Sequence, residues 1–208
     1  MFNYLRDGQE IYRRSFSMIR AEADLSRIPQ DLEKLTVRVI HACGMTDIIN
    51  DLCFSDGAGD AGRIALATGA PILCDSKMVA DGIILSRLPS NNIIRCTLHD
   101  PIVPDLAKRI GNTRSAAALE LWRPYLSSSI VLIGNAPTAL FYLLDMIDSG
   151  APHPALILGF PVGFVGAAES KSLLAEHNQG VPYITLLGRR GGSAIAAAAI
   201  NALGTDIE

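Results

Sequence analysis

The 208-residue sequence has no excess of positive charge and no apolar run long enough to cross a bilayer. Its net charge is −3 at pH 7, and we expect no nucleic-acid partner, because a general nucleic-acid binder needs a basic face. Residues 154–168, the longest uncharged apolar stretch, are too short to span a membrane and are interrupted by Pro161 and several glycines. Residues 1–14 carry both signs of charge and lack the apolar segment of a secretory leader. We therefore expect a cytoplasmic protein that makes no membrane contact.

The sequence also has few cysteines, and none of them form a C-x-x-C pair. Cys43, Cys53, Cys74 and Cys96 lie far apart, mostly within apolar runs. This spacing favours reduced thiols and gives no reason to expect a metal site. Apolar residues make up 49% of the chain and charged residues 19%, so one large domain with a substantial core is expected over residues 1–208.

Short runs rich in valine and isoleucine alternate with helical stretches through most of the chain. These runs show little polar alternation, which is typical of strands buried on both faces. Helical patterns cover 116–126 and 139–147, and a small-residue helix that could pack closely follows at 194–199. The predicted strands are 37–40, 71–74, 93–98, 130–133, 155–158 and 183–187. The pattern predicts an α/β fold, a mostly parallel sheet flanked by helices on both faces.

The first thirty-five residues follow a different pattern. Ile11, Phe16, Ile19 and Ala23 recur at helical spacing, with no strand-like run among them. We therefore predict an N-terminal helical arm over 1–35 and an α/β core over 36–208.

Ligands in an open parallel sheet bind at the carboxyl ends of the strands, so residues just after the predicted strands are candidate site residues. His41 would end the strand 37–40, where its ring could face a crevice and exchange a proton near neutral pH. A core histidine with one hydrogen bond is the alternative interpretation.

The loop 134–138 joins a predicted strand to a helix that begins at Pro137. Free backbone N–H groups at such a helix start can hold a carboxylate or a phosphate, which makes Asn135 and Thr138 candidate ligand-binding residues. An ordinary capped helix explains the pattern equally well.

The segment 188–193 places two arginines among glycines, ahead of the small-residue helix. Guanidinium groups bind carboxylates or phosphates with two hydrogen bonds, and the lysine of a Walker loop is absent. A solvated basic turn is the alternative. Outside this segment, Arg114 lies before another predicted helix and is a further candidate anion-binding residue. The candidate anion-binding residues here are Arg189, Arg190, Gly191, Gly192 and Ser193.

The loop 159–166 is apolar and rich in glycine. With Phe160 and Phe164 exposed or half exposed, it could form a wall for a flat apolar ligand; tight packing is the alternative. Together these segments suit a ligand with several carboxylates and a large apolar body.

Residues 57–62 match the pattern G-x-G-x-x-G of dinucleotide-binding proteins. That pattern must follow a strand and open a helix. Residues 51–56 are polar and more helix-like than strand-like, and Asp60 would lie beside the pyrophosphate. We therefore regard an NAD-dependent oxidoreductase as a minor alternative.

Six segments resemble the precorrin-8X methylmutase family, and the likeness runs from YRRSF at 12–16 to the C-terminal small-residue helix. The segments are IHACG (40–44), APILCD (70–75), GNTRSA (111–116), GNAPTAL (134–140), PVGFVGAAESK (161–171) and GRRGGS (188–193). Long motifs in this order are specific to the family.

The resemblance implies an isomerase of cobalamin biosynthesis that moves a methyl group from C11 to C12 of precorrin-8X and gives hydrogenobyrinate. It implies His41 as the catalytic residue, Ser15 as a substrate contact, no cofactor or metal, and a homodimer with substrate near the subunit interface. Residues 42–44 resemble those of the metal-free branch.

The chemistry of this reaction agrees with the residues. The macrocycle carries acid arms that arginines and helix starts can bind. A [1,5]-sigmatropic shift needs little covalent help, but a histidine that protonates or hydrogen-bonds the ring would favour it. Arg14 and Ser15 lie on the arm, which could reach a second subunit across a two-fold axis. A non-catalytic tetrapyrrole carrier is the other alternative. The sequence leaves open which arginine holds which arm, and whether a cobalt-bearing substrate is accepted.

Overall fold

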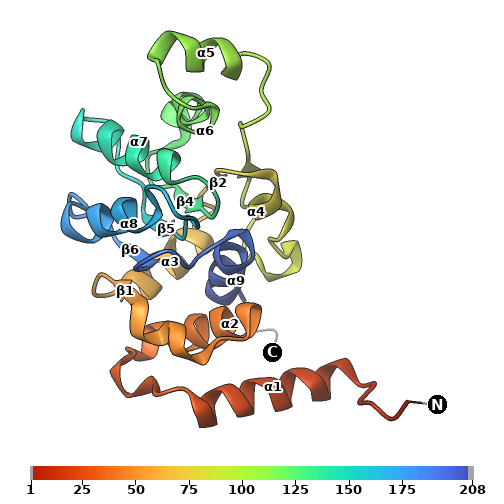
Figure 1. Cartoon of the computed structure of the whole chain (residues 1–208). Helices are drawn as coiled ribbons and strands as arrows, with labels where there is room; N and C mark the ends of the chain where they lie inside the picture. Colours follow the sequence, from red (N-terminus) through yellow and green to blue (C-terminus); the bar gives the residue numbers. More distant parts are fainter. Residues whose placement is uncertain (1, 206–208) are drawn as a thin grey trace.

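The protein, described here over residues 2–205 by a computed structural model, is built around a six-stranded sheet (Figure 1). Residue 1 and residues 206–208, which the expected single domain includes, lie outside the described residues. The strand order is β1-β6-β5-β4-β2-β3, and only the β1–β6 pair is antiparallel. The strands are β1 Leu52–Phe54, β2 Ile72–Cys74, β3 Ile94–Arg95, β4 Ile130–Ile133, β5 Leu156–Gly159 and β6 Tyr183–Leu186.

Helices cover both faces of this sheet, as predicted. Alternate residues of β4 show it: Ile130 and Leu132 pack into one core cluster, while Val131 and Ile133 pack into another. Because successive strand side chains point to opposite faces, both faces of β4 are buried. The α-helices are α1 Gly8–Glu22, α2 Glu33–Cys43, α3 Ala58–Ala67, α4 Lys77–Asp81, α5 Val103–Ile110, α6 Arg114–Ala118, α7 Pro137–Asp148, α8 Ala167–Glu176 and α9 Ser193–Leu203. The 3₁₀ helices are η1 Leu25–Arg27, η2 Gln30–Leu32, η3 Thr46–Asp51, η4 Leu85–Arg87 and η5 Leu119–Tyr125.

The predicted strand at 37–40 is wrong, because these residues belong to helix α2. Leu35, Val37, Val39 and Ile40 are all buried, so the helix is apolar around much of its surface and its periodicity is hidden. Gly44 ends the helix in the left-handed conformation and donates its N–H to the Ile40 carbonyl.

Helix α9 explains how α2 can be buried so deeply. Ala196 and Ala199 of α9 have no exposed surface, and α9 packs along α2 on one side and on β4 and β5 on the other. Small side chains let the helices approach closely, as the alanine-rich sequence of this segment suggested.

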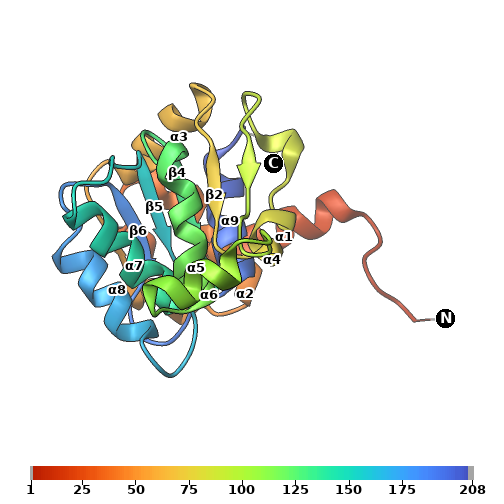
Figure 2. The same ribbon diagram turned by 90° about the horizontal axis from the view of Figure 1, so that it is seen from above.

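Helix α1 lies across α2 at the edge of the molecule, and the chain before it points away from the body (Figures 1 and 2). It buries only Phe16 and Ile19, which agrees with the predicted helical arm. Within the described residues, no helix is long and apolar enough to cross a membrane.

Candidate active site

The carboxyl ends of β2, β4, β5 and β6 meet at one edge of the sheet, and their loops contact one another as expected. The Gly192 N–H donates to the Phe160 carbonyl at 2.8 Å, and the Gly163 N–H donates to the Arg189 carbonyl at 3.2 Å. Ser193 Oγ lies 3.4 Å from Ser76 Oγ, next to the end of β2. Two of the predicted loops, 159–166 and 188–193, and the segment after β2 therefore form one surface.

His41 reaches this region from the last turn of α2 and not from a strand end. Its Nδ1 lies 2.8 Å from Ser15 Oγ on α1, so the two residues that the resemblance singled out are direct partners. When Ser15 donates its hydroxyl proton to Nδ1, the neutral ring carries its proton on Nε2 and can donate it there.

Two aromatic rings contact the imidazole. The centroids of Tyr12 and Phe16 lie 5.3 Å and 5.2 Å from that of His41. Burial, followed by the nearby positive charge of Arg38, lowers the pKa of His41 below its usual 6.5. The free protein therefore holds a neutral imidazole at pH 7.

Two hollows flank α1 beside this pair. A small one of about 170 Å³ is lined by Ser15 and His41 together with Met18, Ile40 and Thr46. A larger one of about 760 Å³ combines two rings with basic groups, and it is lined by Tyr12, Phe16, Arg13, Arg20, Arg38 and Arg87. The larger groove thus offers apolar surface and positive charge next to the histidine.

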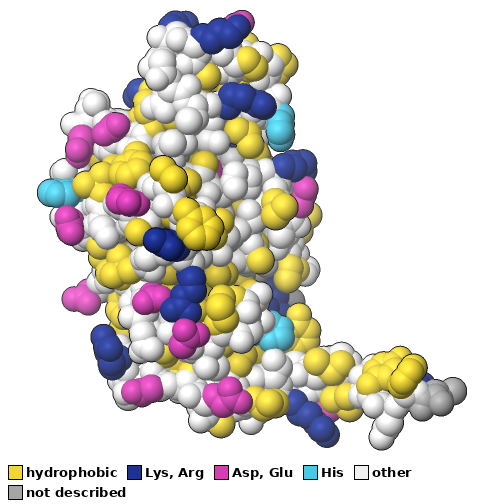
Figure 3. All heavy atoms as spheres, viewed as in Figure 1, with side chains coloured by type: hydrophobic (Ala, Val, Ile, Leu, Met, Phe, Trp, Pro, Cys, Tyr) yellow, Lys and Arg dark blue, Asp and Glu magenta, His cyan; other side chains and the backbone are white. Residues whose placement is uncertain are grey.

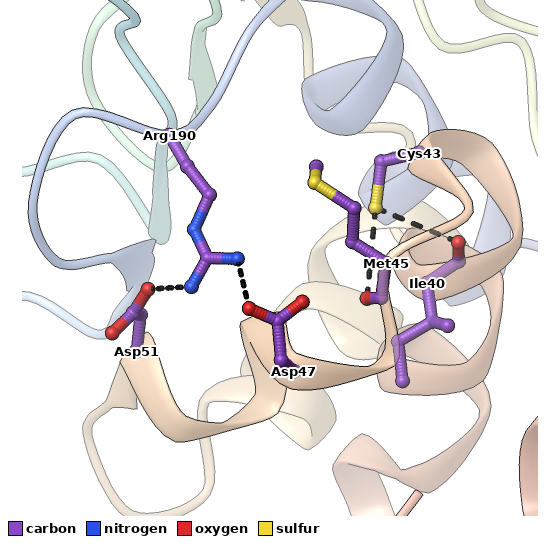
Figure 4. A network of polar contacts seen from close by, with 6 residues as sticks. All are labelled: Ile40, Cys43, Met45, Asp47, Asp51 and Arg190. Atoms are coloured by element: carbon purple, nitrogen blue, oxygen red, sulfur yellow. Dashed lines mark hydrogen bonds and ion pairs between the residues drawn. The ribbon is translucent and has the colours of Figure 1, made fainter. Parts of the chain in front are cut away.

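Arg190 does not extend freely into the site, because its guanidinium already has two carboxylate partners (Figure 4). Its Nη1 lies 2.7 Å from Asp47 Oδ2, and its Nη2 pairs with Asp51 Oδ2. Both aspartates lie on η3, just after α2. Cys43 Sγ, near the end of α2, lies within 3.9 Å of the Met45 carbonyl. Arg190 therefore connects the loop 188–193 to η3, the segment that follows the His41 helix.

Arg189 differs from its neighbour. It is exposed, and its guanidinium carbon lies 5.3 Å from the centre of the Phe164 ring. Figure 3 shows one face of the molecule, where hydrophobic side chains are interspersed with both basic (Lys, Arg) and acidic (Asp, Glu) side chains.

Gly191 and Gly192 hold the loop in place by close packing. A Cβ on Gly191 would overlap the carbonyl oxygens of Phe160 and Pro161. Gly192 has φ +120°, which a larger residue rarely adopts. Glycine is required here for packing and backbone conformation, whether or not the loop also binds an anion.

The apolar loop 159–166 is only partly as predicted. Phe160 is completely buried, so its predicted exposure is wrong; it packs in the main core cluster. Phe164 is 84% exposed and Val165 is 89% exposed. The outer part of the loop is therefore an apolar surface available to a ligand.

The loop 134–138 already binds an anionic group of the protein itself. The backbone N–H groups of Gly134, Asn135 and Ala136 all donate to the carboxylate of Asp75, at 2.9–3.0 Å. Burial raises the pKa of Asp75 despite these three bonds. These three N–H groups are therefore already satisfied, and the Asn135 side chain is exposed.

Thr138 and Arg114 come together away from His41. Thr138 Oγ1 lies 2.8 Å from Thr113 Oγ1, next to Arg114. Arg114 begins α6, is exposed, and has Nη2 3.4 Å from the Leu98 carbonyl oxygen. Arg14, on α1, is exposed and bonds Glu10 at 2.7 Å.

The G-x-G-x-x-G segment does follow a strand, since β1 precedes it and α3 begins at Ala58. The helix-like interpretation of 51–56 was therefore wrong. However, β1 is an antiparallel edge strand, and the Gly59 N–H donates to Asp31 Oδ2 at 3.0 Å. Gly62 allows contact with Leu156 and Leu203. These glycines serve close packing.

Sequence reasoning missed three residues that shape this region. Arg38 lies on α2 beside His41, Asp75 directly follows β2, and Lys171 lies buried on α8 with its amine bonded to the loop 188–193. Asp75 could have been found, because it follows a predicted strand directly. No sequence signal shows that Lys171 is buried.

Comparisons with known proteins identify the family. The precorrin-8X methylmutase family model matches residues 10–205. A protein of Pseudomonas aeruginosa named precorrin-8X methylmutase is 67% identical over the full length of both chains. One of a Sinorhizobium species with the same name is 57% identical and covers 97% of this chain and 96% of its own. A cobalt-precorrin-8 methylmutase of Leptospira interrogans is 37% identical over 94% of this chain and 92% of its own.

A solved structure has the same fold. The crystal structure of the precorrin-8X methylmutase of Thermus thermophilus superposes with a TM-score of 0.85 at 38% identity, and covers 94% of each chain. The segments resembling the family lie along this shared fold, with the Ser15–His41 pair at its helical edge. The chain belongs to the precorrin-8X methylmutase family.

Proposed function

We propose that this protein is an isomerase that moves the methyl group of precorrin-8X from C11 to C12 by a [1,5]-sigmatropic shift, giving hydrogenobyrinate in cobalamin biosynthesis. The observation that carries the proposal is the contact between Ser15 and His41 beside a groove with aromatic and basic walls. A corrin precursor has an apolar ring and acidic arms, and this groove offers partners for both.

His41 is the proton donor in this proposal, and Ser15 orients its ring. The resting imidazole is neutral because its pKa is lowered. The carboxylates of a bound substrate would raise that pKa again, since nearby negative charge favours the charged ring. His41 would thus take up a proton as the substrate binds and share it with the macrocycle, drawing electron density from the ring while the methyl group migrates.

The acid arms have several candidate partners. Arg189 and Arg114 are exposed, and Arg14 lies on α1 beside Ser15. Gly191, Gly192 and Ser193 supply the backbone near Arg189. Asn135 and Thr138 stand further along the same sheet edge, where their side chains, and not the N–H groups given to Asp75, would contact the substrate. Arg190 acts in this scheme mainly by holding the loop.

The proposed substrate is the metal-free precorrin-8X, and the reaction needs no cofactor. The relatives named for the metal-free substrate are 67% and 57% identical to this chain, whereas the Leptospira relative named for the cobalt form is 37% identical. This difference supports the metal-free assignment. The four free thiols are in keeping with action in the reducing cytoplasm.

The working form in this proposal is a homodimer in which α1 and the chain before it form part of the interface. Phe2, Tyr4, Ile11 and Met18 are exposed there, at 92%, 66%, 45% and 61%. A two-fold axis would cover these side chains with the same patch of a second copy. The partner would also close the groove beside His41.

An absorbance spectrum recorded after mixing the protein with precorrin-8X tests the main proposal. An isomerase converts the spectrum to that of hydrogenobyrinate with catalytic turnover. A tetrapyrrole carrier would bind the product and convert nothing, and an NAD-dependent enzyme would need the dinucleotide. No conversion by a folded dimer would overturn the proposal.

Subunit exchange tests the shared site. A variant lacking Ser15 and Arg14 is mixed with a His41 variant, and a heterodimer with shared sites should regain one working site. A monomer with full activity by light scattering under assay conditions would contradict the dimer proposal.

A further inference from the structure

Lys171 is a charged residue buried completely inside the protein. It lies in the middle of α8 and has 0% exposed surface. Its Nζ donates to the backbone carbonyl oxygen of Arg190 at 2.5 Å. Burying an amine is costly without a partner, so this hydrogen bond fixes where the Arg190 carbonyl must lie.

Backbone contacts also hold the loop that receives this bond. Gly192 donates to Phe160, Gly163 donates to the Arg189 carbonyl, and Gly191 packs against two carbonyl oxygens. The Lys171 side chain ties the loop to helix α8.

The same loop residue reaches toward the catalytic helix through its side chain. Arg190 pairs with Asp47 and Asp51 on η3, and η3 follows directly after α2, which carries His41. Lys171 is thus connected to the His41 helix through one residue, whose carbonyl it holds and whose guanidinium holds η3.

We propose that Lys171 is a positioning residue: its buried ammonium sets the loop 188–193, which binds the acid arms of the substrate, at a fixed distance from the His41 helix. This inference rests on the proposed function of the same site. Lys171 itself has no exposed surface and does not touch the substrate.

The charge state of Lys171 gives this role a pH range. Burial lowers the pKa of its amine to about 8, and the Asp51 carboxylate acts in the opposite direction. At pH 7 the amine is charged and donates a strong bond; above about pH 8 it becomes neutral and the bond weakens. Arg190, whose pKa is raised by Asp51 and Asp47, keeps its charge over that range.

The variant K171M tests the proposal, because methionine preserves the length and apolar stem of the side chain while removing the donor. The dimer should remain folded, with KM for precorrin-8X raised by about ten-fold and kcat changed by less than about two-fold, since losing a hydrogen bond from a charged group typically has at least that effect. K108M is the matched control, since Lys108 is an exposed residue of α5; its KM should stay unchanged.

The pH profile supplies a readout that a purely structural lysine would not change. Wild-type kcat/KM, which already falls above the lowered pKa of His41, should fall more steeply as pH rises through about 8, whereas K171M should keep the shallower fall. If K171M does not fold, the wild-type profile decides alone, and a profile whose slope does not steepen in that range overturns the proposal. A folded K171M with wild-type KM overturns it as well.

Hydrogen exchange separates this inference from the proposed function. In K171M without substrate, the amides of 188–193 and 46–51 should exchange faster than in the wild type, whereas K108M should match the wild type. A wild-type protein that converts no precorrin-8X would refute the function, yet the exchange result would still test the positioning role. Unchanged exchange in both segments would contradict it.

Discussion

His41 and Asp75 are both ionisable groups at the edge where the sequence predicted a binding site, but their surroundings differ sharply. Among residues 2–205, His41 has one hydrogen-bond partner, the Ser15 hydroxyl, and two ring neighbours beside an open groove. Asp75 is buried and accepts three backbone N–H groups. A group with spare hydrogen-bonding capacity can serve a ligand, whereas a group whose capacity is used within the fold stabilises a loop.

The variant His41→Ala tests the reactive member of this comparison and should have the largest effect. Removing a general acid typically lowers the rate by about 100-fold to 10,000-fold, so kcat should fall by that amount while the affinity for the macrocycle changes little. Steady-state kinetics measures kcat, and titration with the product measures the affinity for the macrocycle. Turnover near the wild-type rate would assign His41 a structural role.

The variant Asp75→Ala tests the structural member. It leaves three backbone N–H groups without their acceptor, and we expect the free energy of unfolding to fall by about 1.5–3 kcal/mol, the range for hydrogen bonds to a charged group. Denaturant titration measures it. Asp145→Ala, on exposed α7 surface, is the control. Lost activity with unchanged stability would instead place Asp75 in the chemistry.

Arg189 and Arg190 of the loop 188–193 offer the same contrast between a group open to a ligand and a group whose partners lie within the fold. Arg189→Ala should weaken product binding by about 1.5–3 kcal/mol if its exposed guanidinium holds a carboxylate. Arg190→Ala should lower stability and binding together, because it removes the pairs with Asp47 and Asp51. Equal effects of both on binding, with no loss of stability, would contradict this division of roles.

The pH dependence should reveal the lowered pKa of His41. If the protonated ring is required, kcat/KM falls as pH rises through that lowered pKa, below 6.5, because this parameter reports the free enzyme. The fall in kcat should occur at higher pH, because substrate carboxylates raise the pKa in the complex. Identical profiles for both parameters would mean that the substrate leaves the charge of His41 unaffected.

The smallest effect is expected for Ser15→Ala. It removes one neutral hydrogen bond to the imidazole, which contributes about 1 kcal/mol, so the rate should fall by about five-fold with the histidine still present. Ser172→Ala, on the exposed surface of α8, is the control. A loss as large as that of His41→Ala would make Ser15 a direct participant.

The sequence predicted the parallel part of the sheet well and its edges poorly. The runs at 130–133, 155–158 and 183–187 lie in strands covered on both faces, so their apolar character was unambiguous. The run at 93–98 is reduced to Ile94–Arg95 at an edge, and β1 was missed because its residues are only half buried. The run at 37–40 was misassigned because a helix buried on most sides has the same continuous apolar sequence as a buried strand.

Site residues could be predicted where their residue type pointed to them. The contacts between these residues could not be predicted, because the fold creates them. The resemblance gave both His41 and Ser15, but their contact depends on how α1 crosses α2. Nothing near Arg190 in the sequence reveals Asp47 and Asp51 as its partners, since they are brought close only by the fold. The roles of Asp75 and Lys171 depend on the same long-range packing.

The burial of α2 against α9 has a consequence for how this protein forms. The helix that carries His41 is made well before the surface it packs on, which lies at residues 193–203. β1 likewise pairs with β6, far along the chain. Contacts between such distant segments slow folding, because a long loop must close before they form. The apolar face of α2 therefore stays exposed until α9 arrives, and this interval is when the nascent protein is most prone to aggregate.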